Sequence, residues 1–140
     1  MMCTINALCL ESLPEFLSWC LDLKAQYGKD RPTFSLNILR FPSFQGPLVL
    51  PDEVRDNHRH RLTQWLHDNG SSPLLHQMEV NQLQRLIDYL DVVKTPHSEA
   101  FNRPALINDF VQFYNQYDQR RGKNFAVTFP ELAVWYNKLK

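Results

Sequence analysis

Polar residues that could bind a ligand lie near the ends of the two strands that the sequence predicts. The first apolar segment, Met2–Leu8, includes Asn6, and the second, Thr33–Phe41, includes Asn37 and Arg40. In parallel α/β sheets and barrels, ligands bind at the carboxyl ends of the strands. Asn6, Asn37 and Arg40 are therefore the candidate residues facing a cofactor or substrate. The alternative is that Asn6 only begins a turn and that Arg40 pairs with a loop carboxylate.

The histidines are badly spaced for a metal site. His58 and His60 are two residues apart on a predicted helix, so their side chains point about 200° apart. His60 and His67 share a face, but about 10 Å separates them along the helix axis. Because zinc ligands lie about 2 Å from the ion, we expect these residues and His76 to be exposed to solvent instead.

The three cysteines, Cys3, Cys9 and Cys20, match no metal or iron–sulfur spacing. Their odd number favours free thiols in a reducing cytoplasm over a disulfide framework. Cys20 falls on the apolar stripe of a predicted helix, so we expect a buried thiol there. The chain also lacks the glycine-rich phosphate-binding motifs and the G-x-S-x-G motif of hydrolases.

The overall charge excludes general attraction to nucleic acid or anionic membranes, because 15 basic residues balance 15 acidic ones. No apolar run reaches the roughly 18 residues of a membrane span. The one basic cluster, Arg120–Lys123, suits a helix carboxyl end, with a phosphate or carboxylate contact as the alternative. We expect neither a nucleic acid nor a membrane as partner, and we expect the aromatic residues near the carboxyl terminus to form core.

Regular elements that would position these residues follow from caps and periodicity. A capping box at Ser12–Glu15 opens a helix that ends at Gly28. Apolar residues occupy both faces of Thr33–Phe41, which predicts a strand covered on both sides. Residues 42–51 contain three prolines and several apolar residues, and we expect an ordered loop.

The rest of the chain is predicted to be helical. Three of the predicted helices span Pro51–Asn69, Ser72–Val93 and Asn102–Gly122, with a loop at Thr95–Phe101 before the third. Thr128 and Glu131 repeat the logic of the first cap and open a last short helix. The fold class is thus α/β: a strand–helix–strand unit in residues 1–50, followed by about four helices in residues 51–140 that pack on it as one structural unit.

Two parallel strands with one crossover helix form a marginal sheet with two unsatisfied edges. Later helices, a second copy or missing strands must cover those edges. We therefore expect either the tail of a larger protein or a small domain that needs a partner.

Several segments resemble the radical S-adenosylmethionine (SAM) proteins, in particular the twitch-domain members of phages and marine bacteria. Thr4-Ile5-Asn6 followed by Leu13-Pro14-Glu15-Phe16-Leu17 resembles a late strand and helix of their partial (β/α) barrel. Phe34–Phe41 and the following Pro42–Leu48 loop resemble the next strand and its loop. The tail, from Tyr117-Asp118-Gln119-Arg120-Arg121-Gly122-Lys123 to Thr128-Phe129-Pro130-Glu131-Leu132, resembles their C-terminal helices.

The resemblance implies a barrel whose early strands hold a [4Fe–4S] cluster and SAM, from which a 5′-deoxyadenosyl radical is made. The family's C-x3-C-x2-C cluster motif and its Gly-Gly-Glu element are missing here. This chain alone is therefore expected to bind neither cofactor and to lack catalysis. Its expected role is to wall the cavity beside a missing N-terminal half, with Asn6, Asn37 and Arg40 facing the ligand. The alternative is a helical interaction module that dimerises through its strands.

Overall fold

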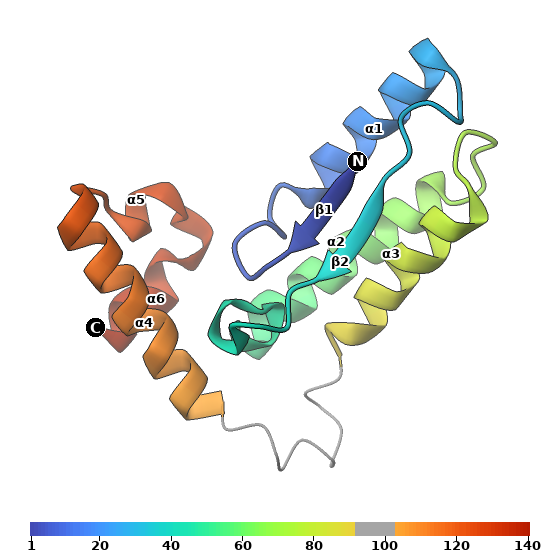
Figure 1. Cartoon of the computed structure of the whole chain (residues 1–140). Helices are drawn as coiled ribbons and strands as arrows, with labels where there is room; N and C mark the ends of the chain where they lie inside the picture. The colour runs from blue at the N-terminus through green and yellow to red at the C-terminus, as the bar shows by residue number, and fades with distance from the viewer. Residues whose placement is uncertain (92–102) are drawn as a thin grey trace.

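The computed structural model describes residues 1–91 and 103–140, which form a mixed α/β structure that is mostly helical (Figure 1). Three elements open the chain: strand β1 (Met2–Ile5), helix α1 (Leu13–Tyr27) and strand β2 (Ser35–Ile38). The strands pair in parallel, with Thr4 beside Asn37. The predicted strand–helix–strand unit is confirmed.

Both strands are shorter than predicted, because the chain turns soon after each of them. β1 stops short of Leu8, where a turn leads into α1, and β2 stops short of Phe41, which a proline follows. Two single 3₁₀ turns come next: η1 (Ser43–Gln45) and η2 (Pro47–Val49). Val49 is fully buried, so this apolar segment is the ordered loop that the sequence predicts.

Helices cover only one face of the sheet. Ile5 and Leu36 are buried on this face, whereas Thr4 and Asn37 are exposed on the other. Because side chains alternate along a strand, the exposed face presents the polar residues Thr4 and Asn37 together with the apolar Met2. The expectation of cover on both faces is therefore wrong for the described part of the chain.

Helix α2 (Asp52–Asn69) has the predicted extent, but α3 (Gln77–Tyr89) begins later than Ser72. His76 has an extended backbone, and its N–H donates to Oε1 of Glu79 at 2.9 Å, so the helix can begin only at the next residue. The predicted end of this helix at Val93, the loop Thr95–Phe101 and the cap at Asn102 lie outside the described residues.

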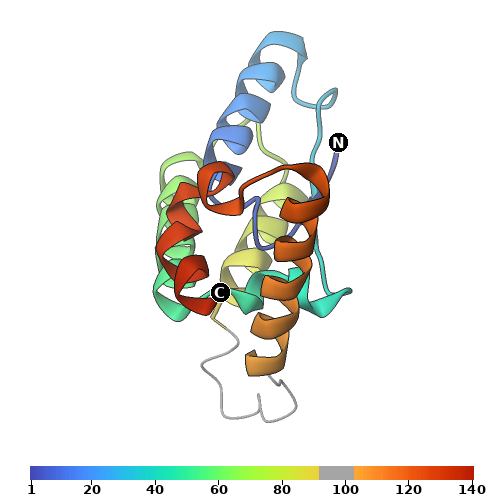
Figure 2. The same cartoon turned by 90° about the vertical axis from the view of Figure 1, so that its left-hand side faces the viewer.

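The C-terminal helices pack around aromatic rings. They comprise α4 (Arg103–Arg121), α5 (Phe125–Thr128), the 3₁₀ turn η5 (Pro130–Leu132) and α6 (Ala133–Leu139). The Phe125 ring stacks on Tyr136 with 4.1 Å between ring centres, and Phe110 meets Phe125 edge-on at 5.7 Å. The expected aromatic core is confirmed for these three residues, whereas Phe113 and Tyr117 of α4 are exposed. Figure 2, seen from the left-hand side of Figure 1, shows these helices grouped in front of the rest of the chain.

Two predicted helix caps do not form. Ser12 has helical backbone angles, and its hydroxyl donates to the Cys9 carbonyl instead of accepting the N–H of Glu15. Thr128 is the last residue of α5, and its hydroxyl donates to the carbonyl of Asn124. In both places a carbonyl three or four residues earlier competes successfully for the hydroxyl. The helix predicted to follow Thr128 is formed by η5 and α6, whereas α5, which precedes it, was not predicted. Across residues 1–91 and 103–140, none of the helices combines the length and apolarity needed to cross a membrane.

Candidate functional site at the strand ends

The outer edge of β2 is closed by side chains of α3 rather than by another strand. The N–H of Phe34 donates to Oε2 of Glu79 at 3.0 Å, and the N–H of Leu36 donates to Oε1 of Gln82 at 2.6 Å. Arg85 Nη2 donates to the Leu36 carbonyl at 3.0 Å. Backbone groups that a neighbouring strand would bond are thus already satisfied. β2 is consequently a terminal strand of its sheet.

The outer edge of β1 has no comparable cover within the described ranges. On the side that faces β2, the carbonyl of Ile5 accepts the N–H of Leu39, the residue after β2, at 2.8 Å. Because backbone groups alternate in direction, the N–H and carbonyl of Thr4 point to the other side. There the Thr4 carbonyl meets only the Cys9 thiol, at 4.0 Å. The N–H of Asn6 donates to the same sulfur at 3.3 Å, whereas the Thr4 N–H has no hydrogen-bond partner among the described residues.

Glu79 is held in place by a fully buried ion pair with Lys24. Lys24 Nζ lies 2.9 Å from Oε1 of Glu79 and 2.9 Å from the carbonyl of Lys29. The carboxylate also accepts the N–H groups of Phe34 and His76. Burial alone would raise the pKa of Glu79, but these hydrogen bonds and Lys24 together hold it below its ordinary value. A charged carboxylate therefore ties α1, β2 and α3 together.

Asn6 lies directly after β1 and shapes the turn there. Its Oδ1 accepts the N–H groups of Leu8 at 2.8 Å and Cys9 at 3.1 Å. Such an Asx turn uses the side-chain oxygen locally. The side-chain oxygen of Asn6 is thus used to form the turn, as the alternative expected. Its side-chain nitrogen makes no hydrogen bond to the described residues.

A polar pocket of about 200 Å³ lies at the carboxyl end of β2, lined by Asn37, Ile38, Arg40 and Arg85. The Arg40 guanidinium lies over the Tyr89 ring, 6.0 Å from its centre. Burial raises the pKa of Tyr89, and the charge of Arg40 acts against that rise. Within the described part of the chain, neither arginine has a carboxylate within 4.0 Å, so both guanidinium groups remain able to bind an anion.

The structure thus places the three predicted site residues at the same end of the sheet. Asn37 and Arg40 meet at the pocket, together with Arg85, which the sequence did not single out. Asn6 ends the neighbouring strand and does not line this pocket. The arrangement offers hydrogen bonds and positive charge to a ligand, and it contains no side chain placed for nucleophilic attack.

Metal ligands do not converge: no three His, Cys, Asp or Glu side chains of residues 1–91 and 103–140 surround a common point. Cys20 is buried as predicted, and burial, with the charge of Glu79, raises its pKa to about 11. His58 contradicts its predicted exposure, because it lies on the α2 face that also buries Leu62 and Trp65. It is 3% exposed, and burial lowers its pKa.

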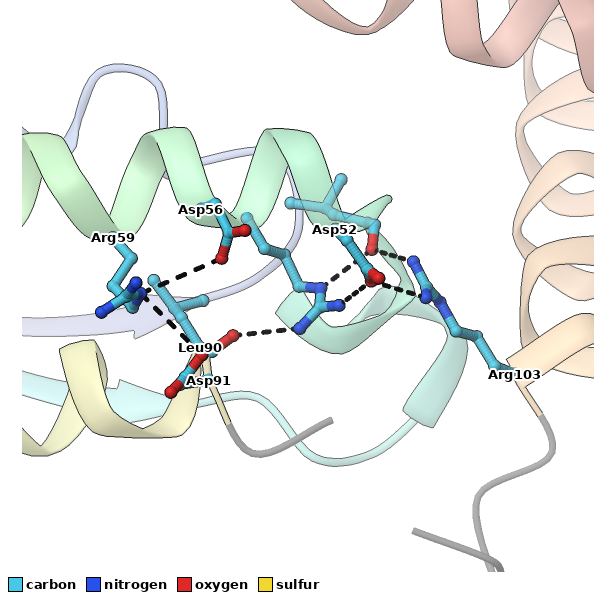
Figure 3. A network of polar contacts seen from close by, with 8 residues as sticks. Asp52, Asp56, Arg59, Leu90, Asp91 and Arg103 are labelled. Atoms are coloured by element: carbon cyan, nitrogen blue, oxygen red, sulfur yellow. Dashed lines mark hydrogen bonds and ion pairs between the residues drawn. The ribbon is translucent and has the colours of Figure 1, made fainter. Parts of the chain in front are cut away.

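A second polar network, centred on Arg55, has a structural role (Figure 3). The buried guanidinium donates to the carbonyls of Leu50 and Leu90, each at 3.0 Å, and pairs with Asp52. Arg103, at the start of α4, donates to Asp52 at 2.8 Å and to the Leu50 carbonyl at 2.6 Å. These contacts join η2, α2, α3 and α4. Because the two arginines bind backbone carbonyls and Asp52, the network holds these elements together.

The residues missed by the sequence reading carried a partial signal. Lys24 continues the buried stripe of Leu17 and Cys20 at helical spacing, and Glu79 precedes the buried Leu83 by one turn. A charged residue on an apolar stripe indicates a buried partner. Gln82 carried no such signal, because its role, accepting the N–H of Leu36, arises only when α3 packs against β2.

No family model, curated protein or solved structure matches this chain. Function must therefore be inferred from the geometry and chemistry of the site.

Proposed function

We propose that this chain supplies the last two strands and the C-terminal helices of a parallel (β/α) barrel of the radical SAM type. The observation that carries this proposal is the difference between the two sheet edges. β2 is closed by α3, whereas β1 keeps an edge that can pair with a preceding strand. A pair of this kind suits the end of a larger parallel sheet better than a complete sheet of two strands.

The uncovered face of the sheet supports the same proposal. In (β/α) barrels, helices cover the outside and alternate residues of each strand point inward. Thr4 and Asn37 lie on the face that the helices leave free, and Asn6 and Arg40 follow the strands. Their part in the reaction is to wall the cavity, hydrogen-bond to the cofactor or substrate and exclude water from a reactive intermediate.

The cofactors of the family are assigned to the rest of the barrel. A [4Fe–4S] cluster needs a set of thiolates, and Cys3, Cys9 and Cys20 do not converge in the part of the chain described. Cys20 is also enclosed in the core, where burial disfavours its thiolate. No catalytic step is therefore assigned to the residues of this chain.

The native protein, purified anaerobically from its source, provides the test. Its intact mass, its iron content and its formation of 5′-deoxyadenosine from SAM under dithionite are measured on one preparation. The proposal predicts a mass substantially above the 16.5 kDa of this chain, bound iron and SAM cleavage. A native mass near that value without iron or SAM cleavage would overturn it.

The open edge also supports a second proposal, an interaction module whose β1 pairs with β1 of another copy. Sedimentation of the 140-residue chain separates the two, because this module predicts one defined dimer at micromolar concentration. Thr4→Pro removes the outward N–H while leaving the bonds to β2, so it would dissociate that dimer. A chain that shows no defined dimer contradicts the module.

A further inference from the structure

A cavity of about 340 Å³ lies between the turn after β1 and the C-terminal helices. Leu8 lines it from the turn, Tyr114 lines it from α4, and Phe125 and Phe129 line it from α5 and the residue that follows. Small-molecule sites begin at about 300 Å³, so this volume suits a ligand of few atoms. The cavity is separate from the polar pocket at the end of β2.

The aromatic walls of the cavity are held in place by the core behind them. Phe125 stacks on the buried Tyr136 at 4.1 Å and lies 5.0 Å from Phe129, measured between ring centres. Tyr114 lies 5.1 Å from Phe125, and burial raises its pKa to about 12. Fixed rings in a region of low polarity favour a flat apolar group, since little order must be gained on binding.

Two opposite charges also line this cavity. The Asp118 carboxylate accepts the N–H of Phe125 through Oδ2 at 2.8 Å. Lys123 lines the same cavity, and its ammonium is not within 4.0 Å of Asp118 or of any other carboxylate in the described ranges. A ligand with only a negative charge would be repelled by Asp118, and a ligand with only a positive charge would be repelled by Lys123. A ligand that carries both charges satisfies both residues.

We propose that the cavity binds a free α-amino acid with an aromatic side chain. The ring would pack against the sides of Tyr114 and Phe129 that line the cavity, opposite Leu8, the ammonium group would face Asp118, and the carboxylate would face Lys123. Because the cavity belongs wholly to this chain, the inference does not depend on the proposed barrel.

Calorimetric titration of the 140-residue chain tests the ligand chemistry with four probes. They are L-phenylalanine, phenylacetate without the ammonium group, phenethylamine without the carboxylate, and glycine without the ring. Phenylalanine is expected to bind at least about tenfold more tightly than each of the others. Absence of saturable phenylalanine binding, or equal binding of phenylacetate, would overturn the proposal.

Two charge variants test the assigned contacts. Lys123→Gln should remove the preference for phenylalanine over phenethylamine, and Asp118→Asn should remove the preference over phenylacetate. Asparagine keeps an oxygen that can accept the N–H of Phe125, so the local fold should survive. Lys138→Gln changes an exposed lysine on α6 and should alter neither preference. Preferences unchanged in both cavity variants would place the amino acid elsewhere and refute the assignment.

Discussion

At the scale of single residues, Glu79 joins α3 to the strand–helix–strand unit. Its carboxylate meets Lys24 from α1, the backbone of Phe34 from the residue before β2, and the start of its own helix. Without the carboxylate, the buried Lys24 ammonium would keep only the Lys29 carbonyl as a partner. A buried ion pair of this kind makes the loss of one partner expensive, because the other charge stays in the interior.

Glu79→Gln should therefore lower the free energy of unfolding by about 3–5 kcal/mol at pH 7, measured by urea denaturation. Glu15→Gln, at an exposed position on α1, provides the control and should change it by less than about 0.5 kcal/mol. A loss below about 1 kcal/mol in the Glu79 variant would contradict the role given to the ion pair.

Acid should weaken the same contact. The folded-state pKa of Glu79 lies below its unfolded value, so its contribution is complete above the unfolded pKa of about 4.3. The contribution is lost as the pH falls through the folded-state pKa. Urea titrations between pH 5 and pH 3 should consequently show a smaller acid-induced loss in Glu79→Gln than in the wild-type chain.

His58 should make stability depend on pH in a different range. Burial lowers its folded-state pKa; Glu11, 3.8 Å from its Nδ1, acts against this shift, and Arg61 adds to it. As the pH falls below about 6.5, the unfolded chain takes up a proton that the folded chain refuses, so stability decreases. His58→Gln should flatten the fall in stability between pH 7 and pH 5. His60→Gln, exposed on the same helix, should leave the fall unchanged; equal behaviour of both variants would contradict this assignment.

At the scale of elements, α3 takes the place of a strand at the edge of β2. Gln82 and Glu79 accept the outward N–H groups, so these amides should exchange slowly with solvent. The Thr4 amide on the outer edge of β1 should exchange much faster. Gln82→Ala should accelerate exchange at Leu36 without affecting Asn37, whereas Gln84→Ala, on the exposed side of α3, should affect neither. Amide exchange followed by NMR measures all of these residues, and a slow Thr4 amide in the dilute chain would contradict an open edge.

Helices were easier to predict from sequence than their boundaries. The apolar stripes of α1, α3 and α4 repeat over several turns, and glycines with positive φ, Gly28 and Gly122, follow α1 and α4. The caps at Ser12 and Thr128 were wrong because a hydroxyl can donate to a carbonyl as readily as it accepts an N–H. Local sequence does not decide between these two bonds.

The candidate site was predictable only in part. Asn6, Asn37 and Arg40 could be placed at strand ends, since a strand shows where its carboxyl end lies. The contact of Arg40 with Tyr89, and the presence of Arg85 in the same pocket, depend on α3 packing against β2, more than 40 residues away in sequence. Such contacts follow from tertiary structure and leave no local pattern.

At the scale of the whole molecule, Arg55 links the strand-bearing part of the chain to the C-terminal helices through Asp52 and Arg103. Arg55→Lys keeps the charge but cannot reach the carbonyls of Leu50 and Leu90 together. It should lower the free energy of unfolding by about 2 kcal/mol, because a buried carbonyl loses its donor. Arg59→Lys, on the same helix but more exposed, should cost less than about 0.5 kcal/mol in the same urea experiment. Equal effects of the two substitutions would contradict a special role for Arg55.

The proposed barrel accounts for the whole arrangement: a closed edge at β2, an open edge at β1 and a free polar face between them. Hydrogen exchange at Thr4, compared between the isolated chain and the native protein from its source, examines this arrangement at the backbone itself. If a preceding strand pairs with β1 in the native protein, the Thr4 amide should be strongly protected there and exposed in the isolated chain. Equal, rapid exchange in both preparations would contradict the barrel, because the edge would then remain unpaired in the native protein.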